Sequence, residues 1–189
     1  MKQFFGVFVF LVLFAALGFG QGIGFKGVGG GVGFITSSMD NGDGTSSSLS
    51  GFLIGAHADL GEFTKGFTLV PDITYWSASK DPVKLTDFSI NANAHYNFTT
   101  EGQFKPYVGA GLGFNSFSST VTVPSFSVGG FTFGGGTASS SASRIGINLL
   151  AGANYKLNET MTLVIEPRYV LASDFNHFTA KVGITYWMK

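Results

Sequence analysis

Three histidines, His57, His95 and His177, are the side chains of this sequence best suited to proton transfer near neutral pH. His177 precedes a hydroxyl, Thr179, but no glutamate follows, so a hydrolase arrangement of hydroxyl, histidine and carboxylate is incomplete there. His57 and His95 fall among polar residues, where a histidine more often belongs to a hydrogen-bond network. The chain also contains no cysteine, which excludes a thiol nucleophile and thiolate metal ligands. We therefore predict no catalytic residue, no metal site and no cofactor.

Charged residues at alternate positions form a second group that could carry chemistry. Three are acidic (Asp59, Asp72, Glu166) and five are basic (Lys105, Arg144, Lys156, Arg168, Lys181). Together with His57 and His95, they are predicted to line the polar interior, or lumen, of a β-barrel, whose strands are described below. One interpretation is an ion pathway, and the other is a paired, hydrogen-bonded plug. A barrel of about eight strands is only just wide enough for its own side chains, which favours the plug.

The elements that must position these residues are β-strands, because apolar and polar residues alternate along the chain. In the clearest strand, Phe88, Ile90, Ala92, Ala94, Tyr96 and Phe98 share one face, and serine, asparagine and histidine occupy the other. The pattern predicts strands over residues 22–36, 49–60, 67–77, 88–98, 102–117, 144–157, 162–171 and 178–188. Glycines blur the alternation in the first of these. The fold class predicted is all-β, an eight-stranded antiparallel transmembrane up-and-down β-barrel.

Composition decides which face of the barrel points outward. A soluble lipocalin-like barrel alternates equally well, with its apolar set inside. Only 12% of the 189 residues are charged, against about 25% in soluble domains, and a water-facing surface would need many more. The apolar face is therefore predicted to contact outer-membrane lipid. Eleven basic residues balance eleven acidic ones, so no net charge draws the chain to nucleic acid.

The first twenty residues have the features of a cleaved signal peptide, with Lys2 before an apolar run and small residues at Gly18 and Gly20. This predicts two segments, a signal peptide over 1–20 and a barrel domain over 21–189. Short turns at 62–66, 99–103 and 158–161 alternate with longer or more polar connections at 37–48, 80–86 and 119–143, as in outer-membrane barrels. With an even number of strands, both termini are expected in the periplasm.

Several short motifs resemble the small eight-stranded barrel family that includes outer-membrane protein X and the transmembrane domain of outer-membrane protein A. Residues 105–114 (KPYVGAGLGF) look like its fifth strand, 166–169 (EPRY) its seventh and 71–75 (PDITY) its third. Lys181, Gly183, Tyr186 and Met188 match the carboxy-terminal signal by which the barrel-assembly machinery recognises its clients. The resemblance implies that this machinery is a partner.

The connection over residues 119–143 contains no charge, and none occurs between Lys105 and Arg144. Phe126, Val128, Phe131 and Phe133 flank Gly129-Gly130, a two-residue hairpin signal. Residues 134–136 and 139–141 are predicted as flexible loop. A disordered loop tip is the alternative to a surface hairpin. If the hairpin forms, its free edges predict an extracellular protein partner that binds through residues 119–143.

The function predicted from these observations is structural or surface-interacting, adhesion-like, in the bacterial outer membrane and without catalysis. A narrow transport pore and an outer-membrane lipid-modifying enzyme remain as alternatives, since a barrel fold alone specifies no chemistry.

Overall fold

The computed structural model describes residues 23–40, 46–173 and 175–188. All regular elements in them are strands: β1 (Gly27–Asp40), β2 (Ser46–Asp59), β3 (Glu62–Thr64), β4 (Phe67–Lys80), β5 (Val83–Asn97), β6 (Phe104–Val128), β7 (Phe131–Lys156), β8 (Met161–Ala172) and β9 (His177–Trp187). No helix among the described residues is long and apolar enough to cross a membrane. The predicted signal peptide lies outside the described residues.

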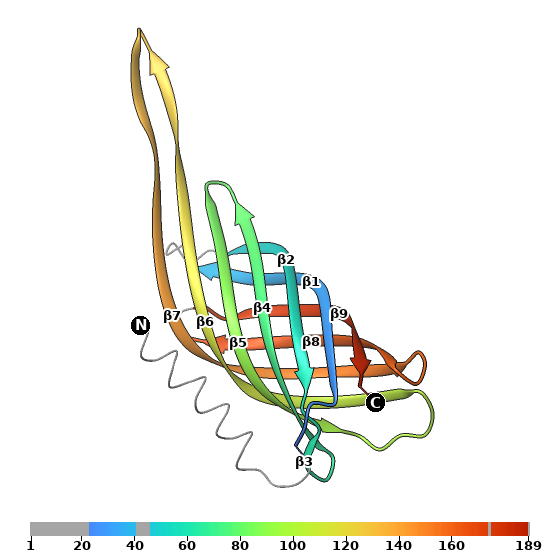
Figure 1. Cartoon of the computed structure of the whole chain (residues 1–189). Coiled ribbons are helices and arrows are strands. Elements are labelled where there is room, and N and C mark those ends of the chain that lie inside the picture. Colours follow the sequence, from blue (N-terminus) through green and yellow to red (C-terminus); the bar gives the residue numbers. More distant parts are fainter. Residues whose placement is uncertain (1–22, 41–45, 174, 189) are drawn as a thin grey trace.

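Eight long strands form a closed antiparallel barrel (Figure 1). Apart from β2 and β3, consecutive strands pair. β1 also pairs with β9, and β2 pairs with β4 from Gly51↔Ala78 to His57↔Asp72, which closes the sheet. The three-residue β3 extends the β2–β4 connection, where the sequence predicts only a turn. Closure leaves no strand edge exposed along the wall of the barrel, which is the condition for spanning lipid with strands. The predicted eight-stranded fold is confirmed.

The apolar face of each strand points outward. Val32 is 64% exposed and Ile145 is 66% exposed, whereas the inward-facing Asn93 is fully buried. In β8 the burial alternates at every residue over Thr162–Ala172, with Ile165, Tyr169 and Leu171 outward and Glu166 and Arg168 inward. A surface of this kind is stable in acyl chains and not in water. The apolar side chains thus face outward, whereas in a soluble barrel they face the interior.

Glycines on β1 and β7 make room for ring side chains of the strands paired with them. The inward positions of β1 include Gly29, Gly31 and Gly33, and a Cβ at Gly29 would collide with the ring of His57. On β7, a Cβ at Gly152 would collide with the ring of Tyr107. The absent side chains explain the blurred alternation of the first predicted strand, because its inward residues are mostly glycine.

The barrel has two unlike ends. At one end lie the first and last described residues, joined where the Met188 amide donates to the Lys26 carbonyl, together with the short turns after β5 and β7. We call this the terminal end. At the other, the hairpin end, β6 and β7 rise far beyond their neighbours (Figure 1). Some predicted connections there are shorter than expected, since only Asp81 and Pro82 separate β4 from β5.

Residues 119–143 are strand, not loop. β6 and β7 stay in one register from Phe104↔Tyr155 to Val128↔Phe131, and Gly129 and Gly130 form the turn with φ of 62° and 84°. Two positive φ values are what a two-residue hairpin turn of the primed type requires. The prediction of a flexible loop at 134–136 and 139–141 is wrong, because both segments pair with β6. Serine and glycine have weak strand propensity, so only the pairing reveals the strand.

Candidate functional site: the lumen and the projecting hairpin

An ion pair between Asp72 of β4 and Arg168 of β8 crosses the middle of the lumen. Arg168 donates through Nη1 to Asp72 Oδ1 at 3.2 Å and through Nη2 to Oδ2 at 2.5 Å. Both side chains are buried, and two-point pairing fixes the guanidinium plane. The two strands are on opposite sides of the barrel in the sheet order, so the pair braces the wall from inside.

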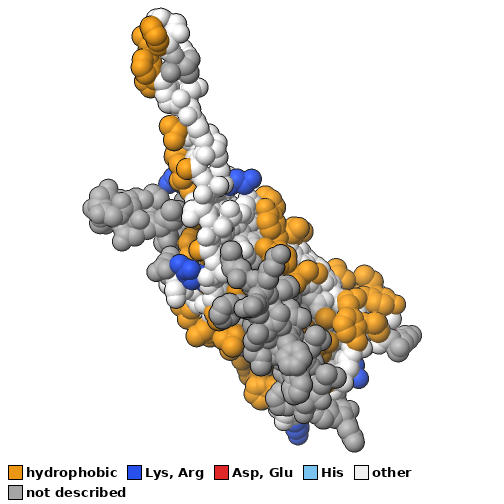
Figure 2. Space-filling view, turned by 60° about the vertical axis from the view of Figure 1, so that its left-hand side comes forward, with side chains coloured by type: hydrophobic (Ala, Val, Ile, Leu, Met, Phe, Trp, Pro, Cys, Tyr) orange, Lys and Arg blue, Asp and Glu red, His pale blue; other side chains and the backbone are white. Residues whose placement is uncertain are grey.

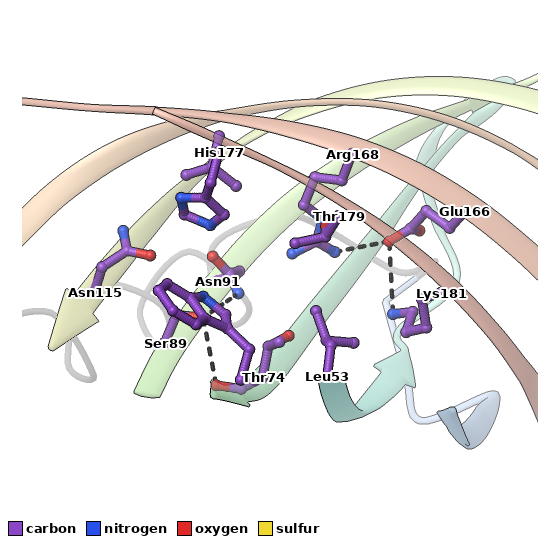
Figure 3. Close-up of a pocket in the computed structure, with 12 residues that line it drawn as sticks. Leu53, Thr74, Ser89, Asn91, Asn115, Glu166, Arg168, His177, Thr179 and Lys181 are labelled. Carbon is purple, nitrogen blue, oxygen red and sulfur yellow. Dashed lines mark hydrogen bonds and ion pairs between the residues drawn. The ribbon is translucent and has the colours of Figure 1, made fainter. Parts of the chain in front are cut away.

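Glu166 is the second anion of this network. Its Oε1 accepts from Arg168 Nη2 at 2.8 Å and lies 3.5 Å from Lys181 Nζ of β9. Its Oε2 accepts from the Tyr107 hydroxyl at 2.8 Å. Figure 3 shows Arg168 and Lys181 both directed toward Glu166. Two buried anions therefore meet two buried cations, which is the balance that burial of charge requires.

Amide side chains complete the coordination of Asp72. Asn91 and Asn93 donate to its two carboxylate oxygens at 2.7 and 2.6 Å. Asn148 in turn donates to both asparagines at 2.9 Å, and Thr74 donates to Asp72 Oδ1 at 3.1 Å. We call these residues, with Tyr107, Glu166, Arg168 and Lys181, the charge network. Tyr107 and the asparagines were not singled out from sequence, although their inward position follows from the same alternation.

The two histidines predicted for the lumen line it on the terminal side of this network. The ring of His95 stacks on Tyr107, with centroids 4.5 Å apart and planes within 7°, and its Nε2 lies 3.9 Å from Glu166 Oε2. His57 Nε2 forms a hydrogen bond of 2.8 Å with Thr185 Oγ1. Neither histidine has a nucleophilic hydroxyl and a free carboxylate beside it in these contacts. His57 Nδ1 and His95 Nε2 are buried without a hydrogen-bond partner among the described residues.

Four of the predicted lumen charges lie outside the buried network. Lys105 and Lys156 are exposed and line an open cup of about 400 Å³ at the terminal end, which Asp59 also borders while it accepts from the Gly61 amide at 2.8 Å. Arg144 is half-buried at the hairpin end, where Nη1 donates to the Ser143 carbonyl at 3.1 Å. These four residues are outside the network because of their positions along the strands. Alternation predicts which face of the sheet a side chain occupies, but not where it lies along the barrel axis.

The hairpin-end half of the lumen is apolar, which the sequence analysis did not predict. Trp76, 1% exposed, stacks on Phe175 at 5.7 Å and contacts Phe117 and His177. Ile35, Leu49, Leu53 and Ala78 pack with it as a buried core. We call Trp76, Phe117, Phe175 and His177 the aromatic cluster. The sequence feature that could have predicted this cluster is a set of apolar residues at inward positions, on strands whose inward face is otherwise polar. These residues are Leu49, Leu53, Trp76 and Ala78.

Small cavities separate these layers. One of about 20 Å³ lies between the aromatic cluster and the charge network (Figure 3), and one of about 30 Å³ lies between the network and the terminal end. Each has room for about one water molecule. In the described part of the lumen, side chains occupy the middle, the cup lies at the terminal end, and a further open cavity of about 170 Å³ lies beside Phe117 and Phe175 at the hairpin end.

His177 and Thr179, considered above as parts of a hydrolase, both face the interior. His177 is packed among the aromatic rings, and Thr179 lines the cavity beside Arg168. Neither side chain reaches the lipid-facing surface. The residues of the assembly motif divide between the two faces: Lys181 is in the charge network, Gly183 packs against the β1 backbone, and Tyr186 and Met188 face outward.

The hairpin beyond the barrel carries the four predicted apolar residues at its far end. Phe126 pairs with Phe133 and Val128 with Phe131, so the four side chains share one face of the ribbon. The Phe126 and Phe133 rings stack with centroids 5.6 Å apart. Figure 2 shows hydrophobic side chains gathered at this end. We call Phe126, Val128, Phe131 and Phe133 the hairpin tip.

Known proteins share this architecture. The barrel of Neisserial surface protein A superposes with a TM-score of 0.63 at 21% identity, covering 89% of this chain and all of that one. Ail, the attachment invasion locus protein of Yersinia pestis, gives 0.52 at 13% identity, covering 87% of this chain and all of Ail. An uncharacterized protein of Haemophilus influenzae is 29% identical over 131 residues, which span 66% of this chain and 68% of that protein. Residues 7–186 match the outer membrane protein beta-barrel domain family, and the chain belongs to this family.

Proposed function

We propose that this protein is a non-enzymatic surface-interaction protein of the bacterial outer membrane, adhesion-like, with a plugged lumen and both termini in the periplasm. The observation that carries the proposal is the hairpin of β6 and β7, which extends beyond the barrel wall. β5 accompanies β6 only as far as Val83↔Val121, and β8 accompanies β7 only from Gly146↔Ala172. Within the described residues, 123–126 of β6 and 131–143 of β7 therefore have a strand partner on one side only.

An unpaired edge offers a row of N–H and C=O groups to another strand. Strand addition gives affinity through the backbone and specificity through alternate side chains. The β7 edge is the longer one, and its side chains over 137–143 are serine, threonine and alanine, which leave the backbone accessible. The partner that fits such an edge is an extended segment of an extracellular protein.

Ail has been crystallised with the heparin analogue sucrose octasulfate, which makes a sulfated sugar the other ligand to consider. Sulfate groups are bound by arginine and lysine. The chain has no charged residue between Lys105 and Arg144, so the projecting hairpin offers no cation to a sulfate. Its chemistry supports a protein strand in preference to a polyanion.

The test replaces Ser119–Ser143 by a short Gly-Ser turn in bacteria that display the protein. The barrel should still insert and show heat-modifiable mobility on gels, because the deleted part includes only the last three β5–β6 pairs, at Ser119 to Val121, and otherwise lies outside the closed wall. Attachment to epithelial cells should fall, and attachment to immobilised heparin should not change. If attachment to cells is the same with and without the hairpin, the interaction role is contradicted.

A finer pair of variants addresses the edge itself. Ser139 and Ser140 are neighbours on β7, and in an antiparallel ladder their N–H groups point to opposite sides. Proline removes the N–H, so Ser139→Pro and Ser140→Pro should differ. The variant that loses an N–H facing the free edge should abolish attachment with the hairpin intact. The variant that loses an N–H facing β6 should weaken β6–β7 pairing. Unchanged attachment in both variants would contradict strand addition.

A further inference from the structure

The hairpin tip is distinct from the edges that would bind a strand. Edge groups lie in the plane of the ribbon, whereas Phe126, Val128, Phe131 and Phe133 project from one face of it, with exposed fractions of 62, 63, 72 and 50%. Together they expose apolar surface on the order of 400–500 Å². A patch of this size at the extreme end of a molecule calls for an apolar contact.

The area is too small for a stable protein interface of its own. Such an interface buries about 800 Å² on each partner and has a polar rim. The tip has no charged neighbour that could supply this rim or steer a charged partner, since residues 106–143 carry no charge. A lipid bilayer has neither requirement, because it accepts apolar side chains one at a time and surrounds them with acyl chains.

The geometry limits how the tip could meet lipid. Free backbone groups along the two edges cannot enter the hydrocarbon, where nothing pairs with them. With all four side chains on one face, the ribbon can lie flat, keeping its edges at the level of the headgroups. This is the arrangement of interfacial elements, whose apolar face sinks about 5–10 Å.

A break in the hairpin separates the tip from its base. Pro124 lacks an N–H, its position opposite Gly135 is absent from the ladder, and Gly134, Gly135 and Gly136 all have positive φ. The tip is therefore joined to the strands beneath it through a position that lacks a ladder pair. Val121 is the last residue of β6 paired with β5, and the seven residues beyond it span about 23 Å. The tip therefore stands about 23 Å beyond the last pair of β5 with β6.

We infer that the hairpin tip inserts its apolar face into the interface of a second, apposed lipid bilayer. This goes beyond the proposed strand addition and uses a different surface of the same hairpin. Because the contact is apolar, it should be independent of lipid charge and of salt, unlike binding through basic residues.

The test uses the full barrel in small lipid nanodiscs and sucrose-loaded phosphatidylcholine vesicles as the probe. The wild type should co-sediment with the vesicles, equally at about 0.1 M and about 1 M salt. Vesicles that also contain phosphatidylglycerol should give the same result. Combined Phe126→Ser, Phe131→Ser and Phe133→Ser should lower binding about tenfold or more. The matched control is Val123→Ser, which removes an exposed apolar side chain outside the tip and should leave binding unchanged.

Insertion is read separately with Phe131→Trp and acceptor vesicles of brominated lipid, which should quench its fluorescence. Heat-modifiable gel mobility verifies that each variant retains the barrel. Absence of wild-type co-sedimentation, loss of binding at high salt, or tip-dependent association of nanodiscs without vesicles would overturn the inference. If hairpin replacement lowers cell attachment while the wild type ignores vesicles, this inference fails and the proposed function stands. If the wild type binds vesicles while hairpin replacement leaves cell attachment unchanged, the inference stands and the proposed function fails.

Discussion

Asp72 and Arg168, 96 residues apart in the sequence, form a two-point ion pair across the interior of the barrel. Both side chains are buried, with exposed fractions of 6% for Arg168 and 1% for Asp72. Glu166 shares Arg168 Nη2 with Asp72, so the pair is the centre of a larger network and not an isolated contact. The barrel is thereby cross-linked from within by non-covalent bonds between strands that do not pair.

Removing one member of this pair should strand the other as a buried, unpaired charge. We expect Arg168→Met to lower the free energy of unfolding by about 3–5 kcal/mol. The measurement is the urea midpoint of the protein folded in lipid vesicles, followed by gel mobility. Lys105→Met is the control, because Lys105 is exposed at the terminal end, and its effect should be within about 0.5 kcal/mol. Equal effects of the two variants would show that the central pair does not stabilise the barrel.

Tyr107 reaches Glu166 only because Gly152 has no side chain. A Cβ at Gly152 would overlap the end of the Tyr107 ring, so Gly152→Ala should displace the hydroxyl from Glu166. The expected cost is about 1–3 kcal/mol of stability, which is typical of overpacking in a filled core. Gly24→Ala serves as the control, since the nearest atom to its added Cβ is 3.9 Å away. In a Tyr107→Val background the Gly152→Ala penalty should shrink to the part caused by the Ile165 carbonyl oxygen, 2.8 Å from the added Cβ, and an undiminished penalty would refute the proposed collision with Tyr107.

The alternation of residues predicted the fold and the inward position of the charges, but not which charges meet. Asp72, Glu166, Arg168 and Lys181 are at the middle of their strands, so their side chains converge. Lys105 and Lys156 have the same facing but lie nearer the strand ends, where the lumen opens to water. Depth depends on strand stagger, and a periodicity of two contains no information about stagger.

The aromatic cluster was missed for a related reason. Trp76 follows Asp72 and Thr74 on the inward face, so an apolar residue there contradicts the general rule of polar inside and apolar outside. Phe175 belongs to the short connection between β8 and β9 and has no strand periodicity at all. Only the closure of the barrel brings it against Trp76 and Phe117.

Asp87 is a buried carboxylate beside this apolar cluster, paired in register with Trp76 and Phe117. It is 1% exposed, and neither carboxylate oxygen has a hydrogen-bond partner among the described residues. The potential donors beside it, the Ser116 amide, the Ser89 hydroxyl and the Trp76 indole N–H, form no well-placed hydrogen bond with it. Burial disfavours the charged carboxylate, so the neutral Asp87→Asn should raise the thermal midpoint of unfolding at any pH where Asp87 is ionised. Differential scanning of detergent-folded protein measures this shift. Asp72→Asn is the contrast, because Asp72 is fully paired and its loss should lower the midpoint. A lower midpoint for Asp87→Asn would indicate that this carboxylate has a stabilising partner.

The proposed plug consists of the aromatic cluster and the charge network in series along the lumen, and it predicts that ions do not pass through the wild-type barrel. The interior cavities on either side of the network are only about 20 and 30 Å³, far too small for a continuous column of water. Single-channel recordings in planar bilayers should therefore show little or no conductance. Trp76→Ala combined with Phe175→Ala removes the stacked rings at the hairpin end, yet conductance should stay low, because the charge network still closes the middle. Adding Arg168→Ala and Glu166→Ala should open a path and give measurable conductance. Large, stable, ion-selective channels in the wild type would contradict the plugged lumen and favour the transport pore.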